Sequence, residues 1–366
     1  MKTEQKQFVE SFPGQAHYYG NAAHAFYDVM RWVQKHRKKP KPNIVMPAYI
    51  PAKLYRFILA AGYVPKFYDV SANLDYSVDE INELIDENTQ MLFAVHFFGI
   101  PVDLKPFKDL TQERNIFLFE DCAHTLNGFY NGKMLGSAGD FTIFSIRKML
   151  QLHCGGILFL NEKPWEFSPS SQNKVRNSFA GYHIAGSRLK FFLNRVSGGR
   201  NLLQKIEIPG TGYIDFAEEQ KVQVKKMDLI SKWYFGQFNL INIINIRREN
   251  VEFLMNAVNR PDLFTQIGYE RVTEVTGNNG KEKRTLANGY VPFSMPILVE
   301  PGWRDRMQQK MLEAGVVCYI GWPEAPFGME GFPQSKQLQA RLLELPVHHY
   351  INQHQLSKMV DVLNSL

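Results

Sequence analysis

The chain has 366 residues, of which 45% are hydrophobic and 21% charged, and its formal net charge is +6. This composition excludes a disordered chain and allows a full core, in two domains or in one large domain with an appendage. The basic balance favours an acidic ligand such as a phosphate or a nucleotide. A nucleic-acid-binding protein is not expected, because no Lys/Arg stripe interleaved with aromatic residues occurs.

The three cysteines, Cys122, Cys154 and Cys318, are too few for a disulfide framework and lack metal-ligand spacing, so we expect no metal site. The amino terminus has no apolar segment typical of a leader, and no run of about 18 apolar residues occurs. We therefore expect a soluble cytoplasmic protein that does not interact with membranes.

Up to about residue 160, short apolar runs alternate with amphipathic stretches, which is typical of a mostly parallel sheet covered by helices. Helices are predicted at 21–34, 50–61 and 104–114, and another begins with a capping box at Ser77–Glu80. Strands are predicted at 43–46, 66–70, 91–96, 116–120, 141–145 and 156–160. An Asn-Gly hairpin at 129–134 brings the total to roughly seven strands.

The second half of the chain is predicted to hold a long helical region and a smaller α/β unit. The helical region covers 218–258, with a possible break at 241–246, and 352–366 is predicted to form an amphipathic helix. We expect a large α/β domain over residues 1–250 and a small C-terminal domain over 251–366.

Residues 116–160 bring reactive side chains to the ends of two predicted strands. One apolar run ends in Glu120 and Asp121, and the next ends in Ser145, with Lys148 three residues later and 27 after Asp121. Ligands of α/β sheets bind at the carboxyl ends of the strands. A carboxylate for a pyridinium nitrogen and a lysine for an aldehyde suit pyridoxal phosphate.

Each of these two residues also has an ordinary structural interpretation. Asp121 could cap the turn after its strand, and Lys148 could be a surface lysine. The functional interpretation is favoured because Lys148 stands next to Arg147 and among apolar residues, where its amine would be partly desolvated and free to attack.

A phosphate group has two candidate binding segments. Gly20 and Asn21 immediately precede a predicted helix, whose first N–H groups favour an anion, and Ser145 offers a hydroxyl. Asn21 could equally be a plain N-cap, and the two roles are compatible.

Two histidines follow predicted strands. His124 could donate a hydrogen bond to a phenolic oxygen of a cofactor ring, whereas His96 is interpreted as structural. Strand alternation places Glu120 on the opposite face from Asp121, so these two residues are not expected to be an acid–base pair.

Several motifs together resemble the DegT/DnrJ/EryC1/StrS aminotransferases, which act on keto-sugars within the fold-type-I pyridoxal-phosphate enzymes. The resemblance covers most of residues 16–161 and returns near the C-terminus. It rests on the segments Gly20–Ala23, Val95–Pro101, Glu120–His124, Phe144–Lys148 with Gly155-Gly156, and Leu345–His348. E-D-x-A-H, F-S-x-x-K and G-G in this order are specific to the family, whereas any one of them alone is not.

The resemblance implies a role for each matching residue. Lys148 would bind the cofactor aldehyde, and Asp121 would contact the pyridine nitrogen. His124 would contact the ring oxygen, and Ser145 with Gly20-Asn21 would hold the phosphate. The family fold further implies pyridoxal 5'-phosphate as cofactor, a keto-sugar acceptor, possibly nucleotide-linked, an amino-acid donor such as glutamate, and a homodimer.

The chain departs from the family pattern in three places. The spacing from Ser145 to Lys148 is three, as in a shorter F-S-x-R-K branch, where much of the family has five. The ring-stacking aromatic falls near Pro51, which leaves Tyr49 as its stand-in. The partner-subunit segment at 210–216 lacks the usual Asn and Arg.

Two alternatives therefore stay open. Related sugar dehydratases carry a histidine at the lysine position, and His153 is near enough in sequence to keep that reaction in view. A pseudoenzyme that binds a ligand or partner without chemistry is the other alternative, motivated by the altered partner segment.

Overall fold

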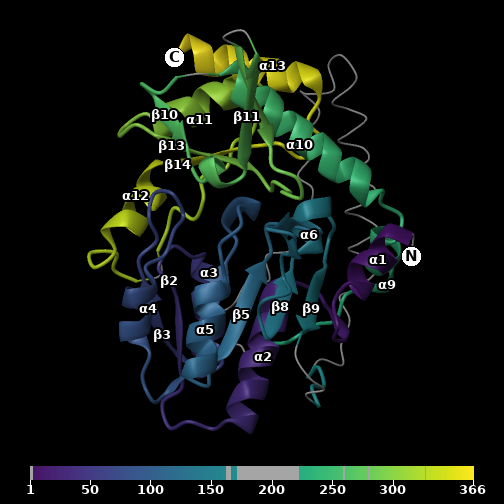
Figure 1. Cartoon of the computed structure of the whole chain (residues 1–366), viewed down its shortest axis with the longest axis vertical. Coiled ribbons are helices and arrows are strands. Elements are labelled where there is room, and N and C mark those ends of the chain that lie inside the picture. Colours follow the sequence, from purple (N-terminus) through teal and green to yellow (C-terminus); the bar gives the residue numbers. More distant parts are fainter. Residues whose placement is uncertain (1–2, 162–165, 171–221, 259, 279–280, 326) are drawn as a thin grey trace.

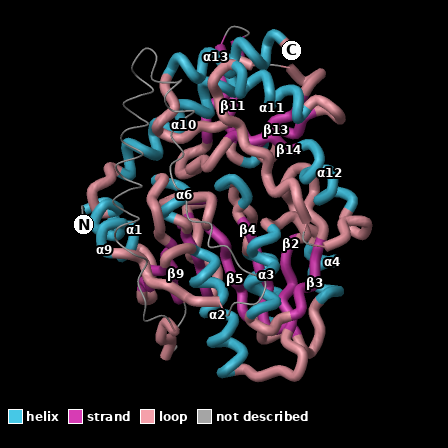
Figure 2. Tube along the Cα trace, turned by 180° about the vertical axis from the view of Figure 1, so that it is seen from behind, coloured by secondary structure: helices cyan, strands magenta, loops and turns pink. Residues whose placement is uncertain are grey.

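The computed structural model describes residues 3–161, 166–170, 222–258, 260–278, 281–325 and 327–366. A seven-stranded sheet with helices on both faces forms the N-terminal part, and a smaller set of strands and helices lies at the end of the sheet where α6 is found (Figures 1 and 2). This is the predicted α/β fold. No helix among these residues is both long enough and apolar enough to cross a bilayer.

The large sheet has the order β1-β9-β8-β5-β4-β2-β3. Its central pairings are parallel, whereas β9 is antiparallel to both β8 and β1. The strands are β1 (Ala16–Tyr19), β2 (Asn43–Pro47), β3 (Val64–Tyr68), β4 (Thr89–Val95), β5 (Phe117–Cys122), β8 (Phe141–Phe144) and β9 (Gly156–Leu160). The count of seven was predicted, but the predicted hairpin forms a separate ribbon of β6 (Phe129–Tyr130) and β7 (Lys133–Met134), and β1 takes its place in the sheet.

Most helices of the N-terminal part lie within a few residues of the predicted ranges, whereas α1 and α6 were not predicted. They are α1 (Thr3–Glu10), α2 (Ala22–His36), α3 (Ala52–Ala60), α4 (Val78–Leu84), α5 (Lys105–Glu113) and α6 (Ile146–Leu150). The predicted apolar stripe of α2 is confirmed, because Phe26, Val29, Met30 and Val33 are fully buried.

The capping box predicted for α4 forms only in half. Ser77 Oγ accepts from the backbone N–H of Glu80 at 3.3 Å, as expected of an N-cap. The Glu80 carboxylate instead accepts from the backbone N–H of Asp69 at 3.0 Å, which ties α4 to the residue after β3. A tertiary contact has replaced the local one.

The C-terminal part contains two small sheets and five described helices. The sheets are β10-β13-β14, made of Phe264–Gln266, Met295–Val299 and Leu342–Leu345, and the hairpin of β11 (Thr273–Asn278) with β12 (Lys281–Leu286). The helices are α9 (Leu229–Phe235), α10 (Leu240–Ala257), α11 (Arg304–Glu313), α12 (Pro333–Arg341) and α13 (Gln353–Ser365). The predicted helix at the C-terminus is confirmed, with a capping box at Asn352.

The predicted break at 241–246 is wrong, because these residues are helical in α10. The interruption lies at 236–239, where Asn239 caps α10 by accepting from the backbone N–H of Asn242 at 2.8 Å. A side-chain cap decided the break, rather than the lower helix propensity of β-branched residues. The predicted domain boundary at residue 250 falls inside α10, and the division into two domains stays a prediction.

Candidate active site

The carboxyl ends of β5 and β8 bring five of the predicted residues to one cavity of about 280 Å³. Asn21, Asp121, His124, Ser145 and Lys148 all line it. Asp121 is the penultimate residue of β5, and β5 runs parallel to β8, which is followed directly by Ser145 and α6. The sheet therefore places residues far apart in sequence at a single edge, as predicted.

Lys148 and His124 are in direct contact, and the contact fixes their protonation. Lys148 Nζ lies 2.9 Å from His124 Nε2, while His124 Nδ1 accepts from the backbone N–H of Phe98 at 3.1 Å. Because Nδ1 is an acceptor, the neutral ring carries its proton on Nε2 and donates it to Nζ. Nζ can accept only as a neutral amine, so this arrangement holds Lys148 in its nucleophilic form.

Burial supports the same assignment. It lowers the pKa of the Lys148 amine below its ordinary value, with Asp121 opposing the shift and Arg147 adding to it. Burial also lowers the pKa of His124 well below its ordinary value, and the Lys148 charge adds to that effect. Both shifts favour the neutral forms of the two groups.

Aromatic side chains from the C-terminal part fix the plane of the His124 ring. The Phe293 ring stacks on it at 4.5 Å with an interplanar angle of 7°, and the Trp322 ring lies 5.8 Å away at 24°. Trp322 also lines the cavity. The C-terminal part thus contributes directly to the site.

Asp121 presents a carboxylate to the same cavity. Its Oδ1 accepts from the backbone N–H of Ala123 at 2.7 Å, and no other hydrogen bond to its side chain occurs among the described residues. Burial raises the pKa of this carboxyl, while the Lys148 charge and the Ala123 N–H oppose the shift. A cation placed against the second oxygen would offset the cost of keeping this carboxylate ionised.

Glu120, His96 and Cys122 form a separate, fully buried network behind Asp121. His96 Nε2 lies 2.9 Å from Glu120 Oε1, and His96 Nδ1 accepts from the backbone N–H of Val102 at 3.1 Å. The Glu120 carboxylate also accepts from the three backbone N–H groups of Gly136, Ala138 and Gly139, at 2.6, 3.0 and 2.8 Å. The Glu120 carboxylate in this network is hydrogen-bonded to groups of the protein itself. The network orders the turn after β7 and does not face the cavity.

The N-terminal end of α2 lies against β9, the strand that pairs with β8 on the side away from β5. The Asn21 side chain accepts from the backbone N–H of His24 at 2.9 Å, and Ala22 and Ala23 line the cavity. A Cβ at Gly156 would lie 2.5 Å from Ala22 N, so this close packing requires glycine. Asn21 is therefore the N-cap of α2, as predicted, and it lies at the cavity. The close approach of α2 explains why the second residue of Gly155-Gly156 is a glycine.

Ser145 completes this end of the cavity. The residue is 2% exposed and lines the cavity, and its hydroxyl has no hydrogen-bond partner among the described residues. A hydroxyl that lines the cavity can donate a hydrogen bond to an acceptor bound there.

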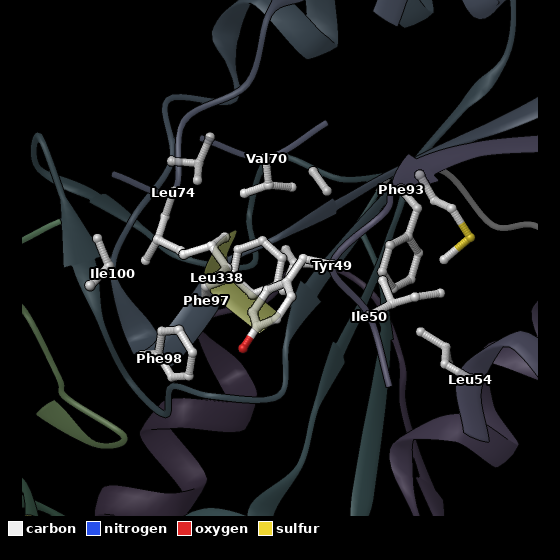
Figure 3. Packing of buried hydrophobic residues seen from close by; sticks show 14 of the residues in the cluster. Tyr49, Ile50, Leu54, Val70, Leu74, Phe93, Phe97, Phe98, Ile100 and Leu338 are labelled. Atoms are coloured by element: carbon white, nitrogen blue, oxygen red, sulfur yellow. The ribbon is translucent and has the colours of Figure 1, made fainter. Parts of the chain in front are cut away.

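Two predicted residues do not line the cavity. Tyr49 is 2% exposed, donates to Gly321 O at 3.1 Å and packs beside Phe97 among other buried side chains (Figure 3). This placement argues against the predicted contact of Tyr49 with a cofactor ring, since Ile50 and Pro51 take that part of the wall. Gly20 acts through its backbone, donating to Lys225 O and accepting from Gly155 N–H. The partner segment at 210–216 lies outside the described residues.

Arg247 was not predicted, although it connects the site to the C-terminal part. This fully buried residue of α10 donates to Met149 O at 2.7 Å, next to Lys148, and to Phe293 O at 2.8 Å. Phe293 is the residue that stacks on His124. One guanidinium therefore holds the backbone on both sides of the Lys148–His124 pair. Its adjacent arginine, Arg248, donates, within the part of the chain that the structure describes, to carbonyls of residues 286–290.

Replacing Arg247 by Met is expected to destabilise the fold by about 2–4 kcal/mol, because buried carbonyls lose their donor. Arg248→Met, the matched control, loses comparable bonds that do not reach Lys148. We expect both variants to unfold at lower urea, but only Arg247→Met to shift the pH at which the absorbance of the cofactor-loaded protein changes. Identical spectral titrations in the two variants would show that Arg247 is merely structural.

Glu344, in β14, is a second residue that sequence reasoning missed. It is buried, its Oε2 accepts from Ser294 Oγ at 2.7 Å, and burial raises the pKa of its carboxyl to about 7, opposed by Ser294 and Lys148. Sequence patterns indicate Glu344 only weakly as a site residue, because a single acid inside an apolar strand is also compatible with an edge position.

The raised pKa predicts that the contribution of Glu344 to the stability of the fold decreases as the pH rises. Below about pH 4.5 the carboxyl is protonated in both states, and between about 4.5 and 7 ionisation favours the unfolded chain. Glu344→Gln should therefore gain stability over the native protein across this window, by up to roughly 3 kcal/mol. Urea unfolding at pH 5 and pH 8 measures the gain. The exposed Glu313→Gln control should show the same stability difference at both pH values, and a pH-independent Glu344→Gln effect would contradict the prediction.

Comparison with known proteins agrees with this geometry. Residues 16–166 match the sequence model of the DegT/DnrJ/EryC1/StrS aminotransferase family. GDP-perosamine synthase from Vibrio cholerae is 29% identical over 122 residues, which are 32% of this chain and 33% of that protein. The chain thus spans about a third of the length of this relative.

Two further similarities extend over more of the chain. GDP-4-keto-6-deoxy-D-mannose 3-dehydratase from Yersinia pseudotuberculosis is 25% identical over 299 residues, which are 77% of this chain and 66% of that protein. The aminotransferase structure from Psychrobacter cryohalolentis covers 99% of this chain and 89% of its own, with a TM-score of 0.66 and 16% identity. The last similarity establishes the fold alone.

Proposed function

Since residues 16–166 match the sequence model of the DegT/DnrJ/EryC1/StrS aminotransferase family, we propose that the chain is a pyridoxal-phosphate-dependent aminotransferase that aminates a keto-sugar. The observation that carries the proposal is the Lys148 amine, which lies 2.9 Å from His124 Nε2 in the cavity that Asp121 also lines. The donor is proposed to be an amino acid such as glutamate, the acceptor a nucleotide-linked keto-sugar, and the active form a homodimer.

The residues present fit the cofactor. Asp121 has an oxygen without a partner among the described residues, which suits a protonated ring nitrogen, and Ser145 has an unpartnered hydroxyl, which suits a phosphate. His124 carries its proton on Nε2 and so suits a phenolic oxygen. Bound pyridoxal phosphate would supply a covalent link to an amine and an electron sink for the carbon next to it.

The residues of the chain would then divide the work. Lys148 Nζ, whose pKa is lowered by burial, would take the proton from the α-carbon of the amino donor. Asp121 would hold a positive charge on the ring nitrogen throughout, because its carboxylate is fixed by the Ala123 N–H. The stacked Phe293 and Trp322 rings would fix the orientation of the His124 ring and exclude water.

The dehydratase alternative rests on the similarity to the Yersinia pseudotuberculosis enzyme over most of the chain. Lys148 opposes it, since the resemblance implies a histidine at this position in dehydratases. His153 does not replace it, because His153 is absent from the lining of the cavity among the described residues. We therefore rank the aminotransferase first.

Mass spectrometry of half-reactions tests the proposal. Protein loaded with pyridoxal phosphate and mixed with glutamate should release 2-oxoglutarate and retain pyridoxamine phosphate. This form should then convert one member of a panel of nucleotide-linked keto-sugars to an amino-sugar. Loss of water from a keto-sugar without transfer of nitrogen would instead identify a dehydratase. Absence of any exchange with amino donors would refute the proposed transaminase.

A further inference from the structure

Basic side chains from three separate parts of the chain gather around the first turn of α2. Lys53, in the first turn of α3, and Arg147, in α6, both line the cavity, and Lys225 lies in the segment before α9. His24, buried in the first turn of α2, is close enough to all three for their charges to affect the pKa of its imidazole. The pKa of its imidazole falls to about 4, first because of burial, then because of Lys53, and also through Lys225 and Arg147.

This grouping of basic side chains at a helix start suits an anionic ligand. The N-terminus of a helix already carries a partial positive charge, and cations are normally found at the opposite end. Among the described residues that line the cavity, three side chains are basic (Lys53, Arg147 and Lys148) and one, Asp121, is acidic. A doubly charged anion at this end of the cavity would be attracted by these basic side chains and by the start of the helix.

A second observation marks where the anion would bind. Ser145 is 2% exposed and lines the same cavity, and its hydroxyl makes no cap bond to α6. Ser145 lies two residues before Arg147, and the backbone N–H of Arg147 donates to Gly155 O while Gly155 N–H donates to Gly20 O. These bonds tie the backbone of Arg147 to the segment that starts α2.

We propose that Arg147 and Lys53 are phosphate-binding residues, which together with Ser145 and the first turn of α2 form a cationic subsite for the phosphate of pyridoxal phosphate. The inference rests on the proposed function. Arg147 provides bidentate, charge-assisted donors, and Lys53 provides a mobile point charge from the facing helix. Phosphate affinity in this chain therefore comes largely from its own cations, rather than from neutral hydroxyl and backbone groups alone.

Paired titrations with pyridoxal phosphate and with pyridoxal, which lacks the phosphate, test the subsite. We expect Arg147→Gln to weaken pyridoxal phosphate binding at least about tenfold, and to change pyridoxal binding less than about twofold. Lys53→Gln should act in the same direction with a smaller effect, and Arg147→Lys should retain part of the affinity. Arg56→Gln, which removes an exposed charge from the same helix as Lys53, is the matched control and should bind both ligands normally.

Equal losses for the two ligands in Arg147→Gln, or no loss for either, would overturn the proposal. Binding of inorganic phosphate tests the subsite independently of the proposed aminotransferase function. If the native protein fails to bind pyridoxal phosphate, the proposed function fails, yet phosphate should still raise the melting temperature of the native protein and not that of Arg147→Gln. An equal response of both proteins to phosphate would overturn the subsite as well.

Discussion

Replacing Lys148 by Ala is expected to lower turnover by at least about 10⁴-fold, because one amine serves both as the covalent attachment point and as the proton carrier. The variant should keep its fold, since the Lys148 side chain contributes one described hydrogen bond, to His124. Turnover is measured by release of 2-oxoglutarate from glutamate, and folding by urea unfolding.

Two controls make this result specific. Lys133→Ala removes an exposed lysine of the β6–β7 hairpin and should leave turnover unchanged. A small primary amine added to Lys148→Ala should restore part of the activity, because it can enter the space that the side chain vacates. Turnover of Lys148→Ala at the native level would contradict the assignment of Lys148.

Replacing Asp121 by Asn should lower turnover by about 10²–10³-fold, because a neutral amide cannot hold a positive charge on a ring nitrogen. The hydrogen bond from the Ala123 N–H can be kept by the amide oxygen, so the loss reflects charge rather than geometry. The absorbance spectrum of the bound cofactor should change together with the rate.

The matched control for this second change is Asp109→Asn, which breaks an exposed ion pair with Lys105 on α5. It should leave both rate and spectrum unchanged, since exposed pairs contribute little. Normal turnover of Asp121→Asn would show that the ring nitrogen needs no charged partner, and the role given to Asp121 would be wrong.

Local patterns predicted the sheet and most of the cavity well. Apolar runs ending in Asp121 and Ser145 fixed the strand ends, and parallel pairing then brought these residues together. The short helix α6 was not predicted, because five residues carry too little periodicity to distinguish a helix from a loop. The edge strand β1 was missed for the same reason, since three half-buried residues and the buried Tyr19 give no clear alternation.

Contacts between distant segments were beyond the reach of sequence patterns. Arg247 was included only in a long helical region, although its partners are carbonyls of Met149 and Phe293. Every residue type has a backbone carbonyl that can accept a hydrogen bond, so no residue pattern in the sequence indicated this contact. Tyr49 was misplaced for a related reason, since its hydroxyl is held by a carbonyl 272 residues away.

The most direct test of the central claim is borohydride reduction of the protein loaded with pyridoxal phosphate, followed by peptide mass mapping. We predict that one phosphopyridoxyl group will be fixed per chain, on the peptide that contains Lys148. Attachment to a different lysine, or to none, would contradict the account of this cavity.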